Sequence, residues 1–499
     1  MSELPKGWVE TELGNVTNYG ATAKPDLKNI DDECWVLELE DIEKDSSKLL
    51  KRLSFADRAP KSSKNSFVKG DVLYGKLRPY LNKMLIATED GICTTEIVPL
   101  KIPNDLFDNR FLFYWLKGKQ FSDYVNAVSY GVNMPRLGTK DGKKAPMIVA
   151  PQAEQKRIVE KLDEVLAQVD TIKARLDGIP DLLKRFRQSV LASAVSGKLT
   201  EEWRVTNSPK KVDNSELAQI NAIQRKESVD GRTQKAKTLD DIPGLKLPTT
   251  WSWNSIDICS LKITDGTHHS PQSYPEGDFM YVTSKNVREG YLDMNNLTYV
   301  TKDTHEEIYS RCDVKFGDVL YVKDGANTGL ACVNSIDEPI SLLSSVGVIK
   351  VADYLTPKYL QHYLNSPIGR KLMLDKMGGT AIKRLTLKKI KESPLSLPPL
   401  EEQKEIVRLV DQYFAFADTI EAQVKKAQAR VDNLTQSILA KAFRGELVAQ
   451  DPTDEPADKL LERIAEARKE AEALAKAAKK ARSTKNPAKK KAEKAAKTV

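Results

Sequence analysis

The chain repeats its own plan, and this repeat constrains the fold more than any other feature of the sequence. The run GDVLY at residues 70–74 recurs at 317–321, and EQK at 154–156 recurs at 402–404. The separation between matching positions drifts from 243 residues at the start of the chain to a constant 248 from Phe111 onward. Between residues 151 and 199, 19 of 49 positions are identical to their partners. A register this steady predicts two copies of one structural unit.

Each copy begins with about 150 residues of mixed strands, turns and helices, so we expect an α+β fold. The runs DVLYGKL and DVLYVK alternate apolar and polar residues and predict strands. The runs FLFYWL and KYLQHYL place apolar residues at helical spacing. Asp108 and Thr356 precede these two runs at equivalent positions, where each suits a helix N-cap.

The second part of each copy is predicted to be a long helix with a coiled-coil seam. Apolar residues follow each other in alternating steps of four and three, in the same phase in both copies. The two helices are expected to pair antiparallel; two amphipathic helices on separate cores are the alternative. Gly178 and Pro180 predict a kink or short break in the first helix. The seam residues are Ile158, Leu162, Val165, Val169, Ile172, Leu176, Ile179, Leu183, Phe186, Val190, Ile406, Val410, Tyr413, Ala417, Ile420, Val424, Ala427, Val431, Leu434 and Ile438.

Six segments follow from these patterns. Residues 201–246 are polar and predict a linker, with a short helix near 216–225. The Ala/Lys-rich tail has no core of its own, so a solvated, fraying or disordered helix is expected, with a DNA-binding arm as the alternative. The expected boundaries are globular domain 1 at 1–150, helix at 151–200, linker at 201–246, globular domain 2 at 247–398, helix at 399–447 and tail at 448–499.

The net charge of +8 is concentrated at the end of the chain. Ten basic residues and one acidic residue lie between Lys476 and Val499, so the other 475 residues are close to neutral. Composition therefore does not identify a nucleic-acid binder. The start of the chain lacks the basic and apolar regions of a secretory signal, and no run is apolar enough to span a membrane, so a cytoplasmic protein is expected.

The sequence lacks the motifs of catalysis and of metal binding. Its five cysteines form no C-x-x-C pair, which disfavours a zinc site or a disulfide framework, and we expect no metal. There is no phosphate-binding G-x-x-x-x-G-K-[ST], no G-x-G-x-x-G and no N/D-P-P-Y/F run of amino-methyltransferases. The pair His268-His269 is expected to lie in a solvated loop. No catalytic residue is therefore predicted, and no cofactor is expected to bind this chain.

Two similar globular units on matched helices form a dimer-like arrangement within one chain. Two readers held at a fixed separation suit a split DNA site, with helix length setting the gap. The runs PQAEQKRIVEKLDEVLAQVDTIKARL and PPLEEQKEIVRLVDQYFAFADTIEAQV carry a specific resemblance. With them, the chain resembles the specificity (S) subunits of type I restriction–modification systems, the HsdS family, over nearly all of residues 4–447, close to the enterobacterial branch.

The resemblance implies a non-catalytic subunit with two target recognition domains. Each domain is expected to read one half of an asymmetric bipartite site on double-stranded DNA. The paired helices are expected to dock two modification (M) subunits, and two restriction (R) subunits complete the nuclease. S-adenosylmethionine would bind the M subunit, and ATP with Mg²⁺ would bind the R subunit.

Candidate DNA contacts come from two loops in each globular domain. Base readout needs forked donors, and phosphate contacts need cations and small hydroxyls. Leu4, Pro5 and Trp8 are expected to pack rather than to read bases. The candidates are Lys76, Arg78, Tyr80, Asn82, Lys83, Tyr130, Asn133 and Arg136 in the first domain, and Lys323, Asn327, Thr328, Thr380, Lys383 and Arg384 in the second.

Two other functions remain open from the sequence alone. One is a stand-alone nuclease or methyltransferase with unusual motifs. The other is a coiled-coil scaffold that binds no DNA. The missing motifs disfavour the enzyme, and the matched loops of forked donors disfavour the scaffold.

Overall fold

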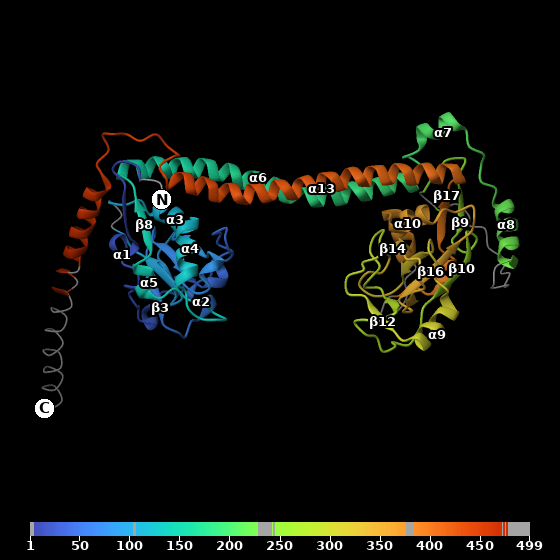
Figure 1. The fold of residues 1–499 in the computed structure, drawn as a ribbon, viewed down its shortest axis with the longest axis horizontal. Helices are drawn as coiled ribbons and strands as arrows, with labels where there is room; N and C mark the ends of the chain where they lie inside the picture. The colour runs from blue at the N-terminus through green and yellow to red at the C-terminus, as the bar shows by residue number, and fades with distance from the viewer. Residues whose placement is uncertain are drawn as a thin grey trace, which may run out of the picture. The chain divides into compact units, whose positions relative to one another are not determined.

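Two compact units make up the chain. The computed structural model describes residues 4–102, 106–227, 242, 245–375, 384–471, 473–474 and 476–477. The first unit comprises residues 1–177 and 426–499, and the second comprises 178–425 (Figure 1). Each unit contains a globular domain, the first part of one long helix and the last part of the other.

The first domain is built from short strands and short helices. Its described strands form three small sheets, in the orders β1–β8, β2–β6–β3 and β5–β4–β7. The strands are β1 (Val9–Glu12), β2 (Trp35–Leu37), β3 (Lys64–Phe67), β4 (Val72–Gly75), β5 (Met84–Ile86), β6 (Gly91–Thr94), β7 (Ile97–Leu100) and β8 (Pro146–Val149). The helices are α1 (Leu13–Val16), α2 (Phe55–Arg58), α3 (Asn109–Lys117), α4 (Lys119–Val128) and α5 (Thr139–Lys143).

The second domain has sheets in the orders β17–β9, β10–β16–β13–β14 and β12–β11–β15. The strands are β9 (Ser252–Ser255), β10 (Ser260–Asp265), β11 (Phe279–Val282), β12 (Thr298–Val300), β13 (Val319–Val322), β14 (Ala331–Val333), β15 (Ser341–Leu342), β16 (Val346–Val351) and β17 (Pro394–Leu397). The helices are α9 (Lys302–Cys312), α10 (Pro357–Asn365), α11 (Pro367–Leu374) and α12 (Leu387–Lys391).

The two domains share part of their topology although their sequences have diverged. The order β14–β13–β16 matches β5–β4–β7, and β17–β9 matches β1–β8. In each domain one pair of strands is parallel, β2 with β6 and β11 with β15. The strands predicted at the DVLY runs are β4 and β13, and the predicted helices are α3 and α10. These predictions are confirmed, and the internal repeat extends to these strand orders. The remaining sheets differ, because β6 is central in β2–β6–β3 and β11 in β12–β11–β15, and β10 adds a strand beside β16 in the second domain.

The predicted N-caps have different outcomes. The Asp108 side chain accepts hydrogen bonds from the backbone N–H groups of Arg110 and Phe111, at 2.8 and 3.3 Å, and caps α3 as predicted. The Thr356 side chain makes no capping bond to α10. Its hydroxyl donates instead to Gln403 Oε1 at 3.3 Å, so it bonds to the following long helix and not to the first turn of α10.

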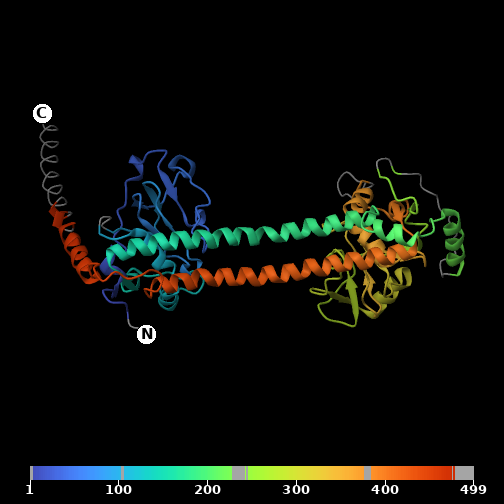
Figure 2. The ribbon, with the colours of Figure 1, turned by 90° about the horizontal axis from the view of Figure 1, so that it is seen from above.

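The long helices α6 (Gln152–Val195) and α13 (Leu400–Ala442) pack together (Figure 2). In the first unit, Lys173 Nζ lies 2.7 Å from Asp432 Oδ1, and Gln428 donates to Asp177 Oδ1 at 2.8 Å. Partner numbers fall along α13 as they rise along α6, so the helices run antiparallel. In the second unit, Arg187 Nη2 pairs with Asp418 Oδ1 at 2.6 Å. The predicted helix pairing is confirmed.

The seam residues are buried to different degrees because two helices alone cannot enclose the middle of their contact. Half of the predicted seam is buried, namely Ile158, Leu162, Val169, Leu183, Val190, Ile406, Val410, Ala417, Val424 and Ile438. Seven positions are half-buried, namely Val165, Leu176, Ile179, Phe186, Ile420, Ala427 and Val431. Three are exposed, namely Ile172, Tyr413 and Leu434.

Of the kink or short break predicted at Gly178 and Pro180, the break is wrong. Helix α6 continues through Pro180 over 44 residues. Proline removes one backbone donor and leaves the carbonyl of residue i−4 without its helical partner. Gly178 and Pro180 are both exposed, so water can satisfy that carbonyl without interrupting the helix.

A buried glutamate fastens the start of each long helix. Glu154 Oε2 accepts a hydrogen bond from Trp8 Nε1 at 2.9 Å. Burial raises the pKa of the Glu154 carboxyl, and the Trp8 donor opposes this shift. At the equivalent position, Glu402 accepts from the Thr200 hydroxyl at 2.6 Å and pairs with Arg204. Trp8 therefore packs and orients the helix, as expected from the sequence.

The neighbouring glutamine links each helix to its own domain. Gln155 Oε1 accepts the backbone N–H of Asp108 at 3.2 Å, and Gln403 Oε1 accepts that of Thr356 at 2.8 Å. Each amide also donates to the carbonyl five residues upstream. These bonds give the repeated EQK run a structural role, because a buried amide must have both its donor and its acceptor satisfied.

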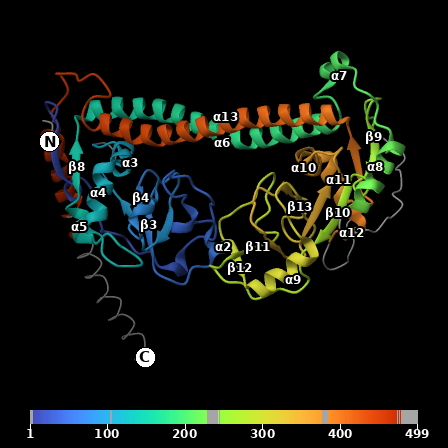
Figure 3. The same ribbon diagram turned by 45° about the vertical axis from the view of Figure 1, so that its right-hand side comes forward.

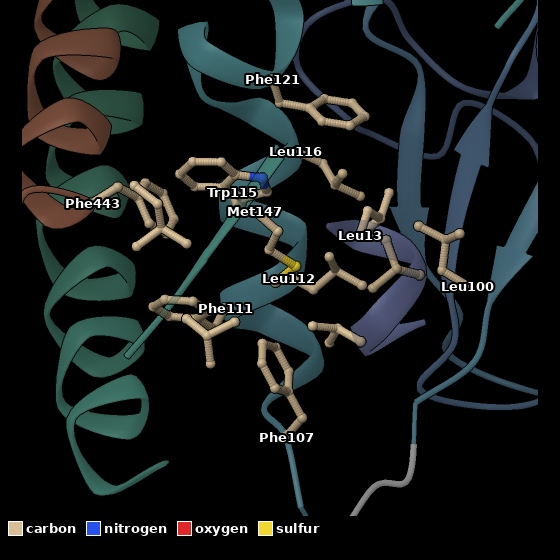
Figure 4. Packing of buried hydrophobic residues seen from close by; sticks show 14 of the residues in the cluster. Leu13, Leu100, Phe107, Phe111, Leu112, Trp115, Leu116, Phe121, Met147 and Phe443 are labelled. Atoms are coloured by element: carbon tan, nitrogen blue, oxygen red, sulfur yellow. The ribbon is translucent and has the colours of Figure 1, made fainter. Parts of the chain in front are cut away.

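The end of each long helix completes the core of the other copy's domain. In the first unit, the Phe443 ring lies 5.2 Å from Phe111 and 5.0 Å from Trp115, centroid to centroid, in edge-to-face contacts (Figure 4). In the second unit, Leu191 and Val195 at the end of α6 are buried in the core of the second domain. Each domain is therefore packed against helix residues from both copies.

The tail begins with a packed helix rather than a solvated one. Residues 457–471 are helical, and Leu460 and Ile464 are fully buried in the core of the first unit. Arg468 donates to the carbonyls of Gly14 and Asn15 at 2.7 and 2.8 Å. The expectation of a tail without core contacts is thus wrong for this tail helix (residues 457–471). Residues 478–499 lie outside the described part of the chain.

A matching helix covers the second domain. After α7 (Glu201–Asn207), helix α8 (Asn214–Glu227) contains the short helix predicted near 216–225 and lies against β10 (Figure 3). Leu217 and Arg225 stand 243 residues before Leu460 and Arg468. Arg225 donates to the Ser260 carbonyl at 2.8 Å, next to the turn equivalent to the one that Arg468 holds. The tail helix and α8 are therefore the same element of the repeat.

The described residues also bear on three simpler expectations. The five cysteines are unpaired, and four of them are buried while Cys34 is half-buried. Within the described ranges, no helix combines the length and the apolar character needed to cross a bilayer. Nor does any group of three or more His, Cys, Asp or Glu side chains in those ranges lie where it could hold a metal ion.

Replacing Leu460 by alanine tests the tail helix. Removing a fully buried leucine costs about 2–5 kcal/mol through lost transfer energy and the cavity left behind. We expect thermal unfolding of the first unit at a lower temperature, together with proteolysis in the tail. Deleting only residues 478–499 is the matched control and should leave the unfolding temperature unchanged. A Leu460→Ala protein as stable as the parent would show that this helix does not stabilise the domain.

The buried side chain of His362 is expected to make the second unit less stable in acid. Its side chain is buried in α10, with Nε2 3.8 Å from Asp411 Oδ1, and burial lowers its pKa to about 3. The unfolded histidine binds a proton near pH 6.5, so stability from the buried neutral ring falls as the pH drops below that value. Between pH 7 and 5 the loss is roughly 2 kcal/mol for this residue. In urea unfolding of the second unit, His362→Gln should remove that part of the pH dependence of the unfolding free energy. An unchanged pH dependence would show that the buried neutral His362 is not its cause.

Candidate nucleic-acid interface

Equivalent backbone bonds hold the two predicted loops of each domain together. In the first domain, the Lys76 N–H donates to the Glu96 carbonyl at 2.9 Å, and the Lys76 carbonyl accepts from Leu137 N–H at 3.0 Å. In the second domain, the Lys323 N–H donates to the Ser345 carbonyl at 3.0 Å, and its carbonyl accepts from Leu385 N–H at 2.9 Å. Arg136 and Arg384 directly precede these two leucines. The structure thus brings each arginine beside the end of β4 or β13.

In the first domain the loop of residues 130–136 closes on itself. Tyr130 and Arg136 exchange backbone hydrogen bonds at 2.9 and 3.2 Å, and Gly131 adopts a φ of +109°. A Cβ at position 131 would lie 2.9 Å from the Met134 carbonyl oxygen, so the turn requires glycine. Arg78 joins this loop by donating its N–H to the Pro135 carbonyl at 2.7 Å. The two loops form one surface.

The first-domain candidates differ in how free their side chains are. Tyr80, Tyr130 and Asn133 are exposed, while Lys76, Arg78 and Asn82 are half-buried. Lys83 Nζ donates to the Leu39 carbonyl at 2.8 Å, which fixes the loop. Arg136 Nε lies 3.1 Å from Glu96 Oε2 and keeps part of its guanidinium exposed. Glu96 is a positioning residue that the sequence did not reveal, because it is 40 positions away in the chain.

In the second domain, several candidate side chains build the loop itself. Lys323 is 8% exposed, and its Nζ lies 3.2 Å from Asp265 Oδ2. The Asn327 amide donates to the Ser284 carbonyl at 2.9 Å, and the Thr328 hydroxyl donates to the Gly325 carbonyl at 2.6 Å. Arg384 is exposed. The remaining two candidates, Thr380 and Lys383, lie outside the described residues.

Comparison with known proteins places this geometry in a family. A family model described as the type I restriction modification DNA specificity domain matches residues 5–181 and 256–428. These two stretches cover more than half of the chain and follow the internal repeat. The chain belongs to the type I restriction–modification specificity subunits. It is therefore the non-catalytic, DNA-specificity part of a type I restriction–modification complex.

Individual relatives agree with this assignment. The type I restriction enzyme EcoBI specificity subunit of Escherichia coli is 34% identical over 375 residues, which cover 74% of this chain and 72% of the relative. The StySPI specificity subunit of Salmonella potsdam is 31% identical and covers 70% of this chain and 67% of the relative.

Solved structures support the fold. The HsdS subunit of Thermoanaerobacter tengcongensis has a TM-score of 0.54 at 21% identity, and covers 89% of this chain and 98% of that one. A chain from a structure of type I R-M complex assembly and conformational transition reaches a TM-score of 0.61 at 19% identity, covering 89% of this chain and all of the other. The paired long helices of this subunit are thus a family feature.

Arg136→Ala and Arg384→Ala test the two loops of the subunit. If each arginine contacts a base, each substitution should cost about 1–3 kcal/mol of specific binding and relax recognition in one half-site only. Glu96→Gln should give a weaker form of the Arg136 effect, since it frees the guanidinium without removing it. DNA binding and methylation are measured with the M partner present. Parental behaviour in both arginine variants would mean that these loops are structural.

Proposed function

We propose that the subunit reads an asymmetric bipartite sequence on double-stranded DNA, with one half-site for each domain. The observation that carries the proposal is the pair of equivalent loop junctions at Lys76–Leu137 and Lys323–Leu385. They offer the same loop framework in both domains. The side chains on that framework differ, so each domain is suited to a different short sequence.

We further propose that α6 and α13 dock two M subunits, which bind S-adenosylmethionine, and that two R subunits, which bind ATP and Mg²⁺, join this complex. Large apolar side chains exposed on the paired helices support the docking. They are Ile172 and Leu434 in the first unit, and Leu182, Tyr413 and Phe416 in the second. Each unit offers such a surface, which suits two copies of one partner. This chain supplies sequence recognition, and its partners supply the chemistry.

Exchanging one domain tests the reading of half-sites. Residues 256–393 are replaced by the corresponding segment of the EcoBI specificity subunit, and methylated adenines are mapped in cells that also carry the M partner. One half of the recognised sequence should change while the other half stays the same. A change in both halves, or in neither, would contradict one reader per half-site. If the unmodified subunit binds no DNA even with its M partner present, the coiled-coil scaffold would be favoured instead.

Shortening both helices tests whether they set the spacing. Residues 169–175 and 430–436 include the paired Lys173 and Asp432, so removing both segments deletes one heptad from each helix and retains the register. Seven helical residues rise about 10.5 Å, roughly three base pairs of B-DNA. The two half-sites should persist with a gap reduced by up to about three base pairs. Removing only one segment is the control and should abolish activity. An unchanged gap in the shortened protein would mean that the helices do not set the spacing.

A further inference from the structure

A buried carboxylate in the second domain gathers three nitrogen-bearing side chains. Asp265, at the end of β10, is only 2% exposed. Its Oδ1 lies 2.8 Å from Arg311 Nη2 and 3.4 Å from His268 Nε2, and its Oδ2 lies 3.2 Å from Lys323 Nζ. These residues come from a loop, from α9 and from the end of β13. The predicted loop at Lys323 is therefore tied through Asp265 to Arg311, which the sequence did not single out, and to His268, which was expected only to lie in a solvated loop.

The nitrogen-bearing side chains of this cluster differ in burial. Lys323 is 8% exposed and lies between Asp265 and Asp324, whose Oδ2 is 3.8 Å from Nζ. A buried ammonium needs such partners, so the Lys323 side chain stabilises the folded loop and is not offered to DNA. Arg311 is 48% exposed and His268 is 55% exposed, so these two form the surface of the cluster.

Three hydrogen bonds fix one edge of the Arg311 guanidinium. Nε donates to the Asp265 carbonyl at 3.3 Å, and Nη2 donates to Asp265 Oδ1 and to His268 Nε2, both at 2.8 Å. Arginine can only donate, so His268 Nε2 accepts and the imidazole carries its proton on Nδ1. Among the described residues, Nη1 of Arg311 has no hydrogen-bond partner. An exposed cation is thus held in place with two N–H groups unused.

The geometry points to a phosphate contact by Arg311. Reading guanine requires two parallel N–H groups on one edge of the guanidinium, and the Nε–Nη2 edge is already occupied. Nη1 alone suits oxygens of a backbone phosphate, which need charge and position but carry no sequence information. We propose that Arg311, positioned by Asp265 and assisted by the Nδ1–H of His268, binds a DNA phosphate at the second half-site. This inference rests on the proposed function, because it presupposes that the second domain binds DNA.

The test measures DNA affinity of the complex with the M partner between 50 and 200 mM salt. Arg311→Ala should weaken binding roughly tenfold, the loss expected for one hydrogen bond to a charged group. It should also lower the slope of log affinity against log salt by about 0.9, the value for one phosphate contact. The recognised sequence should not change. Lys302→Ala is the matched control, because this 73% exposed cation lies at the other end of the same helix and should leave both quantities unaltered.

Arg311→Lys separates the effect of the positive charge from the effect of the anchored guanidinium. Lysine keeps the positive charge but cannot make three anchoring bonds, so the salt slope should stay near the parental value while affinity falls less than in Arg311→Ala. An unchanged affinity and slope in Arg311→Ala would overturn the inference, as would an altered recognised sequence, which would identify a base contact. If scrambling the second half-site leaves the DNA affinity of the parental complex unchanged, the proposed function itself fails, and the inference fails with it.

Discussion

Each domain depends on helix residues from both copies of the repeat. The start of each long helix is fastened to its own domain by Gln155 or Gln403, and in the first copy also by the bond from Trp8 to Glu154. The end of the other helix supplies part of the same core, as Phe443 does against Phe111 and Trp115. Such an arrangement is possible only when the two helices run antiparallel. The pairing of α6 with α13 is thus the constraint on which both cores depend.

This constraint explains why the helical regions retain more identity than the domains. A helix residue must satisfy its helix partner and a domain core together, so few substitutions are tolerated. The Glu-Gln pair must also satisfy buried polar groups, which excludes most replacements. The loops that carry candidate DNA contacts have no such double role. They can diverge while the backbone bonds at Lys76 and Lys323 preserve their placement.

Much of the fold was predictable because it depends on periodicity. The seam, the strands β4 and β13 and the helices α3 and α10 repeat apolar positions at fixed intervals, and the repeat showed each of them twice. The tail helix was missed since its match to α8 consists of few identical residues within an alanine-rich segment. The break at Pro180 was wrong because proline is tolerated where water can reach the freed carbonyl.

The candidate site was less predictable for a different reason. Residue type and loop position could only name Arg136 and Arg384 as candidate DNA contacts, because the burial and the partners of a side chain depend on contacts distant in sequence. Lys323 looks like a surface cation in the sequence and is instead paired with Asp265, 58 residues earlier. Arg311 gave no signal and His268 was expected only to lie in a solvated loop, since their arrangement exists only through that same carboxylate. The roles of side chains in loops can thus be assigned only from the folded structure.

The most direct test of the account is a map of methylated adenines in the genome of a host that carries this subunit with its M partner. Two separate readers on one framework predict two different short blocks of defined bases, separated by a gap of constant length and free sequence. A single uninterrupted motif, or two identical blocks, would contradict the reading of one half-site by each domain.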